Sequence, residues 1–130
     1  FWMYKNHPFQ YVYFNLLARD NFNENFEMDY FGISNKNALE YIIKKENRVV
    51  KIFNMGTTDL NLSKKILDKK IREKINIVGD ANDADYLTNN YRDWNGVIKP
   101  TKFITPENFK IIYEIKVDDV SINTIYKKND

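Results

Sequence analysis

The chain has 130 residues and a formal net charge of only +2, from 20 basic and 18 acidic residues. That length accommodates one domain with a real core, and the balanced charge argues against a dedicated nucleic-acid binder, which normally shows a strong basic excess. Cysteine is absent, which excludes a disulfide framework and a thiolate metal site.

The chain opens with the apolar and aromatic residues 1–4, followed by Lys5. Because Trp and Tyr concentrate where a membrane helix leaves the bilayer, one interpretation of residues 1–8 is a remnant that follows a membrane helix. The other is a boundary inside a soluble protein. No stretch of the sequence approaches the roughly 20 apolar residues that span a bilayer. We expect residues 9–130 to form a single α/β domain.

The first predicted elements are a possible strand at residues 9–17, where aromatic residues mix with Val, and a polar, Asn-rich loop at residues 18–25. Ser34 is a favourable helix N-cap. After it, apolar residues recur at three- and four-residue spacing, at Ala38, Leu39, Ile42 and Ile43. This pattern predicts an amphipathic helix over residues 35–46.

The middle of the chain alternates short apolar runs with a second helical pattern. Residues 48–54 and 75–78 are short and rich in β-branched side chains, which predicts two buried strands. Residues 62–74 predict a helix between them, with Ile66 on its apolar face. The opposite face of this helix is rich in Lys and is expected to be solvated.

A further possible strand covers residues 84–88, and residues 89–108 are irregular. Strands that alternate with helices favour parallel pairing, with the helices covering the sheet. We therefore expect an α/β fold, with a small, mainly parallel sheet flanked by two or more helices.

The C-terminal residues give the clearest local prediction. Residues 110–117 and 120–127 each alternate apolar with polar side chains, and Asn123 falls on the polar side of the second run. The Asp118-Asp119 pair between them suits a two-residue turn. We expect an antiparallel hairpin on the edge of the sheet.

One candidate binding site precedes the first predicted helix. Asp29, Tyr30 and Phe31 place a carboxylate beside aromatic side chains, and Gly32 follows them. Aromatic rings can stack on the C–H face of a sugar while a carboxylate accepts hydroxyl protons, so one interpretation is a saccharide site. The alternative is a turn that wedges the rings into the core.

Two further patterns are weaker. His7 is the only histidine, and with Asp29 it could serve a small hydrolase as general base, although a structural or interfacial role is the alternative. Residues 79–85 begin like a calcium loop, but Ala84 stands at a ligand position and Asp85 stands where the loop needs Gly. The sequence therefore predicts no metal site, and it has no cofactor motif.

Taken together, the motifs resemble the C-terminal extracytoplasmic region of bacterial and archaeal multi-spanning membrane glycosyltransferases of the protein-mannosyltransferase-like kind. That region opens with His-Pro-Tyr-x-Tyr-Val-Tyr-Phe-Asn, matched by residues 7–15, and continues with Glu-Leu-Asp-Tyr-Trp-Gly-x-Ser, matched by residues 27–34. An Ala-Asp-Tyr strand is matched by residues 84–86, and a final aromatic-basic pair by residues 126–127.

The chain departs from the family pattern with Phe9 in place of Tyr, with Phe31 in place of Trp, and with Asn21 and Asn23 where small residues or Gly are usual. The second change removes an indole donor. The resemblance implies a parent enzyme that transfers sugar from a lipid-phosphate-linked donor outside the cytoplasm. In such enzymes the catalytic acidic residues lie in loops among the membrane helices, so no catalytic residue is carried onto this chain.

The resemblance thus implies an accessory, non-catalytic domain on the extracytoplasmic side, anchored in the membrane through its parent protein. It would pack on the membrane-embedded part of the same polypeptide and present or gate a saccharide acceptor. Two other interpretations stay open. One is an independent soluble carbohydrate-binding module that holds its ligand near Asp29 and Tyr30, and the other is the small hydrolase. No nucleic-acid partner is expected.

Overall fold

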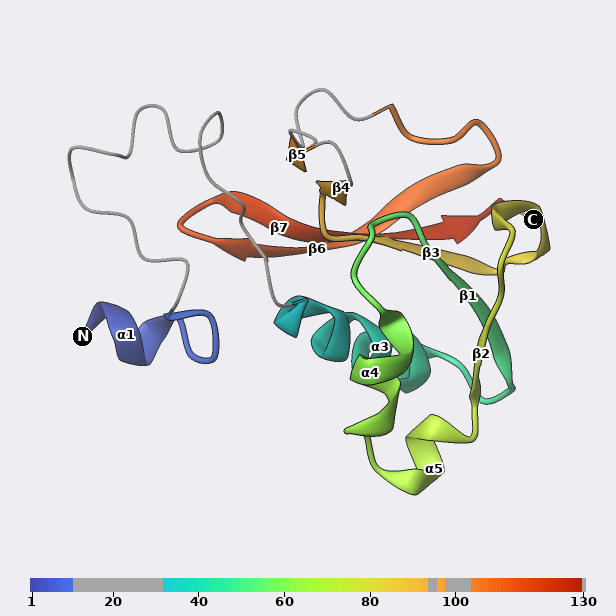
Figure 1. Ribbon diagram of the computed structural model, residues 1–130, viewed down its shortest axis with the longest axis horizontal. Coiled ribbons are helices and arrows are strands. Elements are labelled where there is room, and N and C mark those ends of the chain that lie inside the picture. The colour runs from blue at the N-terminus through green and yellow to red at the C-terminus, as the bar shows by residue number, and fades with distance from the viewer. Residues whose placement is uncertain (11–31, 94–95, 98–103, 130) are drawn as a thin grey trace.

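The computed structural model describes residues 1–10, 32–93, 96–97 and 104–129, and it contains a five-stranded sheet with helices packed against it (Figure 1). The predicted strand at residues 9–17 and the loop at residues 18–25 lie almost wholly outside this part of the chain. In chain order the elements are α1 (Trp2–Lys5), α3 (Ile33–Lys45), β1 (Val50–Asn54), α4 (Leu60–Lys65), α5 (Lys69–Arg72), β2 (Ile75–Ile77), the 3₁₀ turn η2 (Ala81–Asp83), β3 (Tyr86–Asn89), β4 (Arg92–Asp93), β5 (Gly96–Val97), β6 (Phe109–Val117) and β7 (Val120–Lys128).

The sheet is mixed, with strand order β2-β1-β3-β7-β6. β1 runs parallel to β2 and β3, whereas β7 runs antiparallel to β3 and β6. The expected α/β fold with an antiparallel C-terminal hairpin at the sheet edge is therefore confirmed. The description "mainly parallel" fits only the half built by β1, β2 and β3, because the hairpin joins the sheet through β7 and adds two antiparallel pairings.

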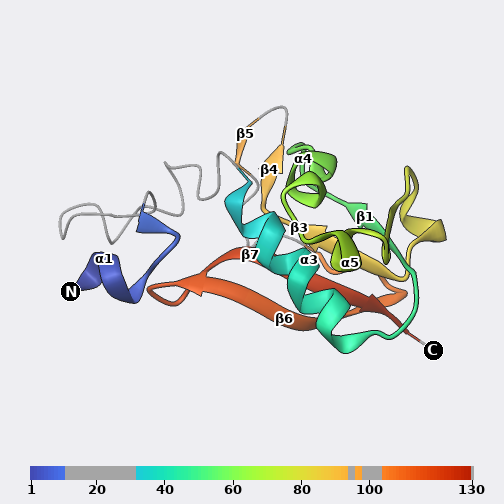
Figure 2. The ribbon, with the colours of Figure 1, turned by 90° about the horizontal axis from the view of Figure 1, so that it is seen from below.

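α3 packs on the sheet through the apolar stripe that the sequence predicts. Ala38, Leu39 and Ile42 are fully buried, and the helix crosses over β7 on the face seen in Figure 2. Each large apolar side chain buried in this way contributes about 1.5–3 kcal/mol. This burial holds the helix against the sheet.

The start of α3 differs from the prediction. The helix begins at Ile33, and Gly32 is its N-cap, so Ser34 lies inside the first turn. Gly32 has φ +64°, a left-handed conformation that glycine adopts at little cost. A Cβ at this position would come within 3.1 Å of both Thr58 and Asn35, so the close approach of the next loop also requires glycine.

Residues 62–74 do not form the single helix that was predicted. α4 ends at Lys65 and α5 begins at Lys69. Between them Leu67 turns inward, whereas Ile66, predicted on the apolar face, is 68% exposed. A continuous helix of that length would span about 20 Å. It would be longer than either of the two strands that it joins, because a strand rises about 3.3 Å per residue and both strands are short. The break lets the chain return to β2 beside β1.

The hairpin turn is confirmed in detail. Asp118 and Asp119 have φ of +47° and +68°, the left-handed conformation that the favoured two-residue turns require. The predicted alternation is wrong in two places. A register shift between Ile111 and Tyr113 leaves these side chains 50% and 43% exposed, and Asn123, predicted on the polar side, is fully buried.

The two connections between the parallel strands lie on opposite faces of the sheet. From β1 to β2 the chain runs through α4 and α5, where Leu60 and Leu67 join the core beneath α3. From β2 to β3 it passes β1 through η2, and Ala81 packs there with Leu87 and Tyr126 in a separate cluster. The strand order therefore reverses between β1 and β3, and such a reversal leaves a crevice at the carboxyl ends of the two strands.

Candidate functional site

The sequence-predicted binding residues Asp29, Tyr30 and Phe31 lie outside the described residues, and Asp29 was also the supposed partner of His7. His7 is exposed on the segment that follows α1, where its Nδ1 lies 2.7 Å from Nε2 of Gln10. Gly32, the residue directly after the predicted motif, lines a crevice.

This crevice, of about 320 Å³, opens where β1 and β3 end. Its wall is formed by the start of α3, the loop between β1 and α4, α4 itself and the first residue of β4. The lining residues are Gly32, Asn35, Thr57, Thr58, Asp59, Leu62, Ser63 and Arg92. In open α/β sheets, the carboxyl ends of strands at an order reversal are where small ligands bind.

Side-chain amides fix the loop after β1. Asn54 donates through Nδ2 to the carbonyl oxygen of Thr58 at 2.6 Å, and Asn35 donates through Nδ2 to Oγ1 of Thr58 at 2.8 Å. The N–H of Thr57 donates to the carbonyl oxygen of Arg92 at 3.0 Å. The loop is thereby tied both to α3 and to the chain that leaves β3.

A buried polar network lies beneath the crevice. Nδ2 of Asn123, on β7, donates to Oγ of Ser34 and to Oδ1 of Asn35, each at 2.8 Å. All three side chains are fully buried. Because an unsatisfied buried polar group costs about 1–3 kcal/mol, this network sets the position of the start of α3 over the sheet, and with it one wall of the crevice.

The crevice carries one charge of each sign. Asp59 is the N-cap of α4, where its Oδ1 accepts the N–H of Asn61 at 2.8 Å. Arg92, half-buried, is on the other side of the loop. Hydroxyl groups of Thr57, Thr58 and Ser63 complete the polar lining, so the site offers both hydrogen-bond donors and acceptors.

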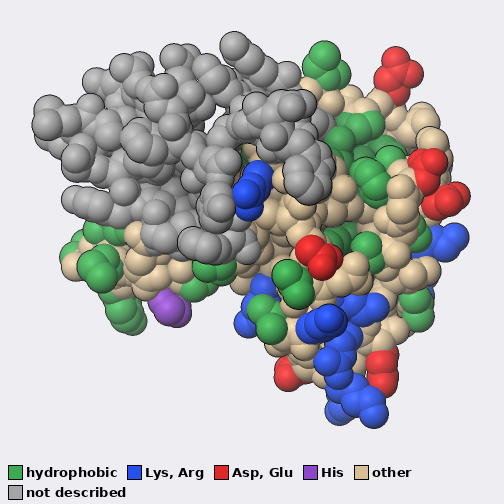
Figure 3. Space-filling model, in the orientation of Figure 1, with side chains coloured by type: hydrophobic (Ala, Val, Ile, Leu, Met, Phe, Trp, Pro, Cys, Tyr) green, Lys and Arg blue, Asp and Glu red, His purple; other side chains and the backbone are tan. Residues whose placement is uncertain are grey.

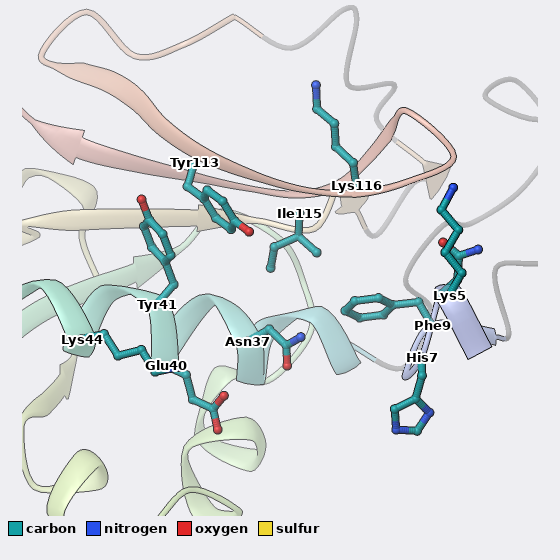
Figure 4. Close-up of a pocket in the computed structure, with 11 residues that line it drawn as sticks. Lys5, His7, Phe9, Asn37, Glu40, Tyr41, Lys44, Tyr113, Ile115 and Lys116 are labelled. Atoms are coloured by element: carbon teal, nitrogen blue, oxygen red, sulfur yellow. The ribbon is translucent and has the colours of Figure 1, made fainter. Parts of the chain in front are cut away.

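A second hollow, of about 390 Å³, lies between α3, β6 and the segment that follows α1 (Figure 4). At one end Tyr41 stacks on Tyr113 with ring centroids 4.1 Å apart, and at the other end lies Phe9. Polar and charged side chains also border it, namely Lys5, Asn6, His7, Asn37, Glu40, Lys44 and Lys116. This groove therefore combines aromatic rings with an excess of positive charge.

α1, next to this groove, presents an exposed apolar face, which we define as Met3 and Tyr4. These residues are 65% and 88% exposed. Figure 3 shows hydrophobic side chains gathered beside the single histidine at this end of the molecule.

The helix itself is fixed to the domain. Nε1 of Trp2 donates to Oδ2 of Asp118 in the hairpin turn at 2.6 Å, and the Trp2 ring packs against the main core. Phe9, a few residues on, is buried in that core. The apolar face of α1 is thus held outward by an anchored segment.

Lysine and arginine side chains gather over α4 and α5, at the lower end of Figure 3. Two of them bond to the backbone: Nζ of Lys64 donates to the carbonyl oxygen of Ile75 at 2.7 Å, and Nη1 of Arg72 donates to that of Lys65 at 3.2 Å. These bonds support the broken connection between β1 and β2, which is a structural use of the basic surface.

A cluster of charges lies at the amino ends of β1 and β3, opposite the crevice. Oη of Tyr86 donates to Glu46, and this hydrogen bond lowers the pKa of Glu46, while burial, together with Glu46, raises the pKa of Tyr86 to about 12. Burial raises the pKa of Asp85, but the bonds from the Arg48 guanidinium, at 3.1 Å, and from the N–H of Lys51 outweigh it, so the pKa of Asp85 is lowered. The cluster ties the end of α3 to the sheet.

Comparisons of the chain with protein-family models, curated proteins and solved structures gave no significant match. The helices that the structure describes are all too short or too polar to cross a bilayer. Within the same residues, no three His, Cys, Asp or Glu side chains are grouped as metal ligands would be. The features that bear on function are therefore the sequence motifs, the crevice, the groove and the apolar face of α1.

Proposed function

We propose that this chain is an accessory, non-catalytic domain on the extracytoplasmic side of a membrane glycosyltransferase that uses a lipid-phosphate-linked sugar donor. It packs on the membrane-embedded part of the same polypeptide and leaves the bond-making chemistry to that part. The motifs at residues 7–15 and 27–34 support the family, and the apolar face of α1 supports the mode of packing.

The apolar face of α1 is the observation that carries the proposal. A large apolar side chain left in water forgoes about 1.5–3 kcal/mol, and a four-residue helix has no stability of its own. Here Trp2 and Phe9 anchor the segment while Met3 and Tyr4 stay exposed. Tyr combines an apolar ring with a polar hydroxyl, which suits the boundary between a membrane and water.

The neighbouring groove adds positive charge to the same surface. Lys5 and Lys44 border it and are both exposed. Ammonium groups form charge-assisted hydrogen bonds with phosphate oxygens. A surface with this charge is suited to face lipid head groups and lipid-phosphate-linked donors at the membrane.

The experiment uses the full-length polypeptide in its native membranes and measures sugar transfer from a lipid-phosphate-linked donor. We expect the Met3→Glu/Tyr4→Glu double variant to lower transfer about tenfold or more, since burial of two large side chains is lost. The matched control is Ile66→Glu/Ile104→Glu, which changes two apolar residues that are 68% and 86% exposed and line neither the groove nor the crevice, and it should retain the rate.

Two results would refute the proposal. One is equal transfer by the two double variants. The other is a parent gene that encodes no apolar spans of about 20 residues in the polypeptide that contains this chain.

A further inference from the structure

We infer that the crevice at the carboxyl ends of β1 and β3 is a binding site for a mono- or disaccharide. The inference rests on the proposed function, because it gives the accessory domain a ligand class, namely the saccharide acceptor. It places the site on Thr57, Asp59 and Ser63, with Leu62 at its edge, a set that the sequence motif around Asp29 does not include.

The position of the crevice is the first argument. The two connections of the parallel strands pass on opposite faces of the sheet, through Leu60 and Leu67 on one side and Ala81 on the other. The strand order therefore reverses between β1 and β3. At such a reversal the loops separate, and the carboxyl ends of the strands are left open for a ligand.

The size and the shape of the crevice fit a small ligand. Its volume of about 320 Å³ falls at the lower end of the range of roughly 300–1,000 Å³ for small-molecule sites. Its loop is held in place before any ligand arrives, because Asn54 and Asn35 both bond to Thr58. A preorganised site spends less binding free energy on ordering its own groups.

The chemistry of the lining selects a neutral polyhydroxylated ligand. Sugar hydroxyls both donate and accept hydrogen bonds. In the crevice the carboxylate of Asp59 accepts, and the hydroxyl of Ser63 can do both. The carboxylate of Asp59 disfavours a free anion such as phosphate. Leu62, 60% exposed, supplies an apolar edge for the C–H groups of a sugar ring.

The test is a titration of the ¹⁵N-labelled 130-residue chain with D-mannose, N-acetyl-D-glucosamine and maltose, followed by amide chemical shifts. Inorganic phosphate serves as the anion probe. Each probe is added up to about 10 mM, which is roughly ten times a dissociation constant of about 1 mM. We expect at least one saccharide to give saturable shifts at the amides of Gly32, Thr57, Thr58 and Ser63.

Asp59→Asn and Asp80→Asn form a matched pair of variants. Both carboxylates cap a short helical turn and accept the N–H of the second residue on, at 2.8 Å in each case, and Asn preserves that cap. Only Asp59 lines the crevice. We expect Asp59→Asn to weaken saccharide binding about tenfold, because a charge-assisted hydrogen bond becomes a neutral one, while Asp80→Asn leaves it unchanged.

Ser63→Trp provides a second variant that fills the crevice from α4, and it should abolish the shifts in a chain whose amide spectrum stays dispersed. The inference is overturned by the absence of saturable shifts with all three saccharides. It is also overturned by phosphate binding more tightly than any saccharide, or by equal weakening in the two Asp variants. Because this titration needs no membrane, its failure is distinct from a failure of the transfer experiment that tests the proposed function.

Discussion

At the scale of single residues, Asn123 connects the sheet to the start of α3. It is fully buried on β7 and gives both protons of its side-chain amide to α3, one to Ser34 and one to Asn35. Asn35 in turn bonds to Thr58 in the wall of the crevice. One amide thus connects the sheet, the start of the helix and the candidate site.

Replacement of Asn123 by Ala should lower the free energy of unfolding by about 1–3 kcal/mol, because two buried acceptors on α3 lose their donor. Urea denaturation measures the change. Asn76→Ala, at an exposed position of β2, is the control and should stay within about 0.5 kcal/mol of the parent. If both variants unfolded at the same urea concentration, the network would have no net stabilising role.

The charge cluster at the amino ends of β1 and β3 makes stability depend on pH. The hydrogen bond from Tyr86 lowers the pKa of Glu46 below its usual 4.5, and the Arg48 and Lys51 bonds lower the pKa of Asp85 below 3.8. A carboxylate whose pKa is lower in the folded state stabilises that state above its usual pKa. This contribution is lost as the pH falls through the lowered value.

The free energy of unfolding should therefore fall as the pH drops from about 5 toward 3, as measured by urea denaturation at a series of pH values. Glu46→Gln should flatten this dependence because the titrating group is removed. Tyr86→Phe should flatten the pH dependence to a smaller extent, because it removes the strongest hydrogen bond to the Glu46 carboxylate. Glu107→Gln, at an exposed site, should leave the slope unchanged, and a slope that Glu46→Gln does not alter would refute the assignment.

Among the elements, the hairpin of β6 and β7 depends on a turn with two non-glycine residues at positive φ. Asp tolerates the left-handed conformation better than most residues, but glycine adopts it with less strain. Asp119→Gly should therefore raise the free energy of unfolding by about 0.5–1 kcal/mol, measured as a shift in the thermal or urea midpoint.

Asp118→Gly is the informative comparison for this turn. It gains the same backbone freedom but loses the acceptor for Nε1 of Trp2, so its net gain should be smaller. A larger gain for Asp118→Gly than for Asp119→Gly would mean that the contact between α1 and the hairpin does not stabilise the domain.

The connection between β1 and β2 shows what local pattern leaves undetermined. Apolar periodicity alone favours one helix over residues 62–74, because Ile66 and Leu67 both fit a helical face. In the structure the chain breaks between α4 and α5, buries Leu67 in the core and leaves Ile66 exposed, a choice that local periodicity does not determine. The start of α3 is a similar case, because contact with Thr58 selects Gly32 as the N-cap.

At the scale of the whole molecule, the sequence predicts the elements better than it predicts their arrangement. Helical spacing gives α3, and the two Asp residues between alternating runs give the hairpin. Whether β7 joins the parallel strands, and in which direction, depends on packing between segments far apart in the chain, for which local periodicity has no signal.

The candidate site has a recognisable sequence signal that lies outside the motifs at residues 7–15 and 27–34. Asn54 ends a predicted buried strand, and Thr57, Thr58 and Asp59 follow it. In a parallel sheet, polar residues directly after a strand lie at the carboxyl edge, where ligands bind. Arg92 has no such signal, because its place depends on how the chain leaves β3.

The central claim is that the apolar face of α1 packs on the membrane-embedded part of the same polypeptide. Photo-crosslinking of the full-length protein in its native membranes tests it most directly, with a photoreactive amino acid at Tyr4 or, as the control, at Ile66, both of them exposed. Tyr4 should crosslink within the polypeptide to its membrane-embedded part, and Ile66 should not. Crosslinks of equal yield from the two positions, or none from Tyr4, would contradict the claim.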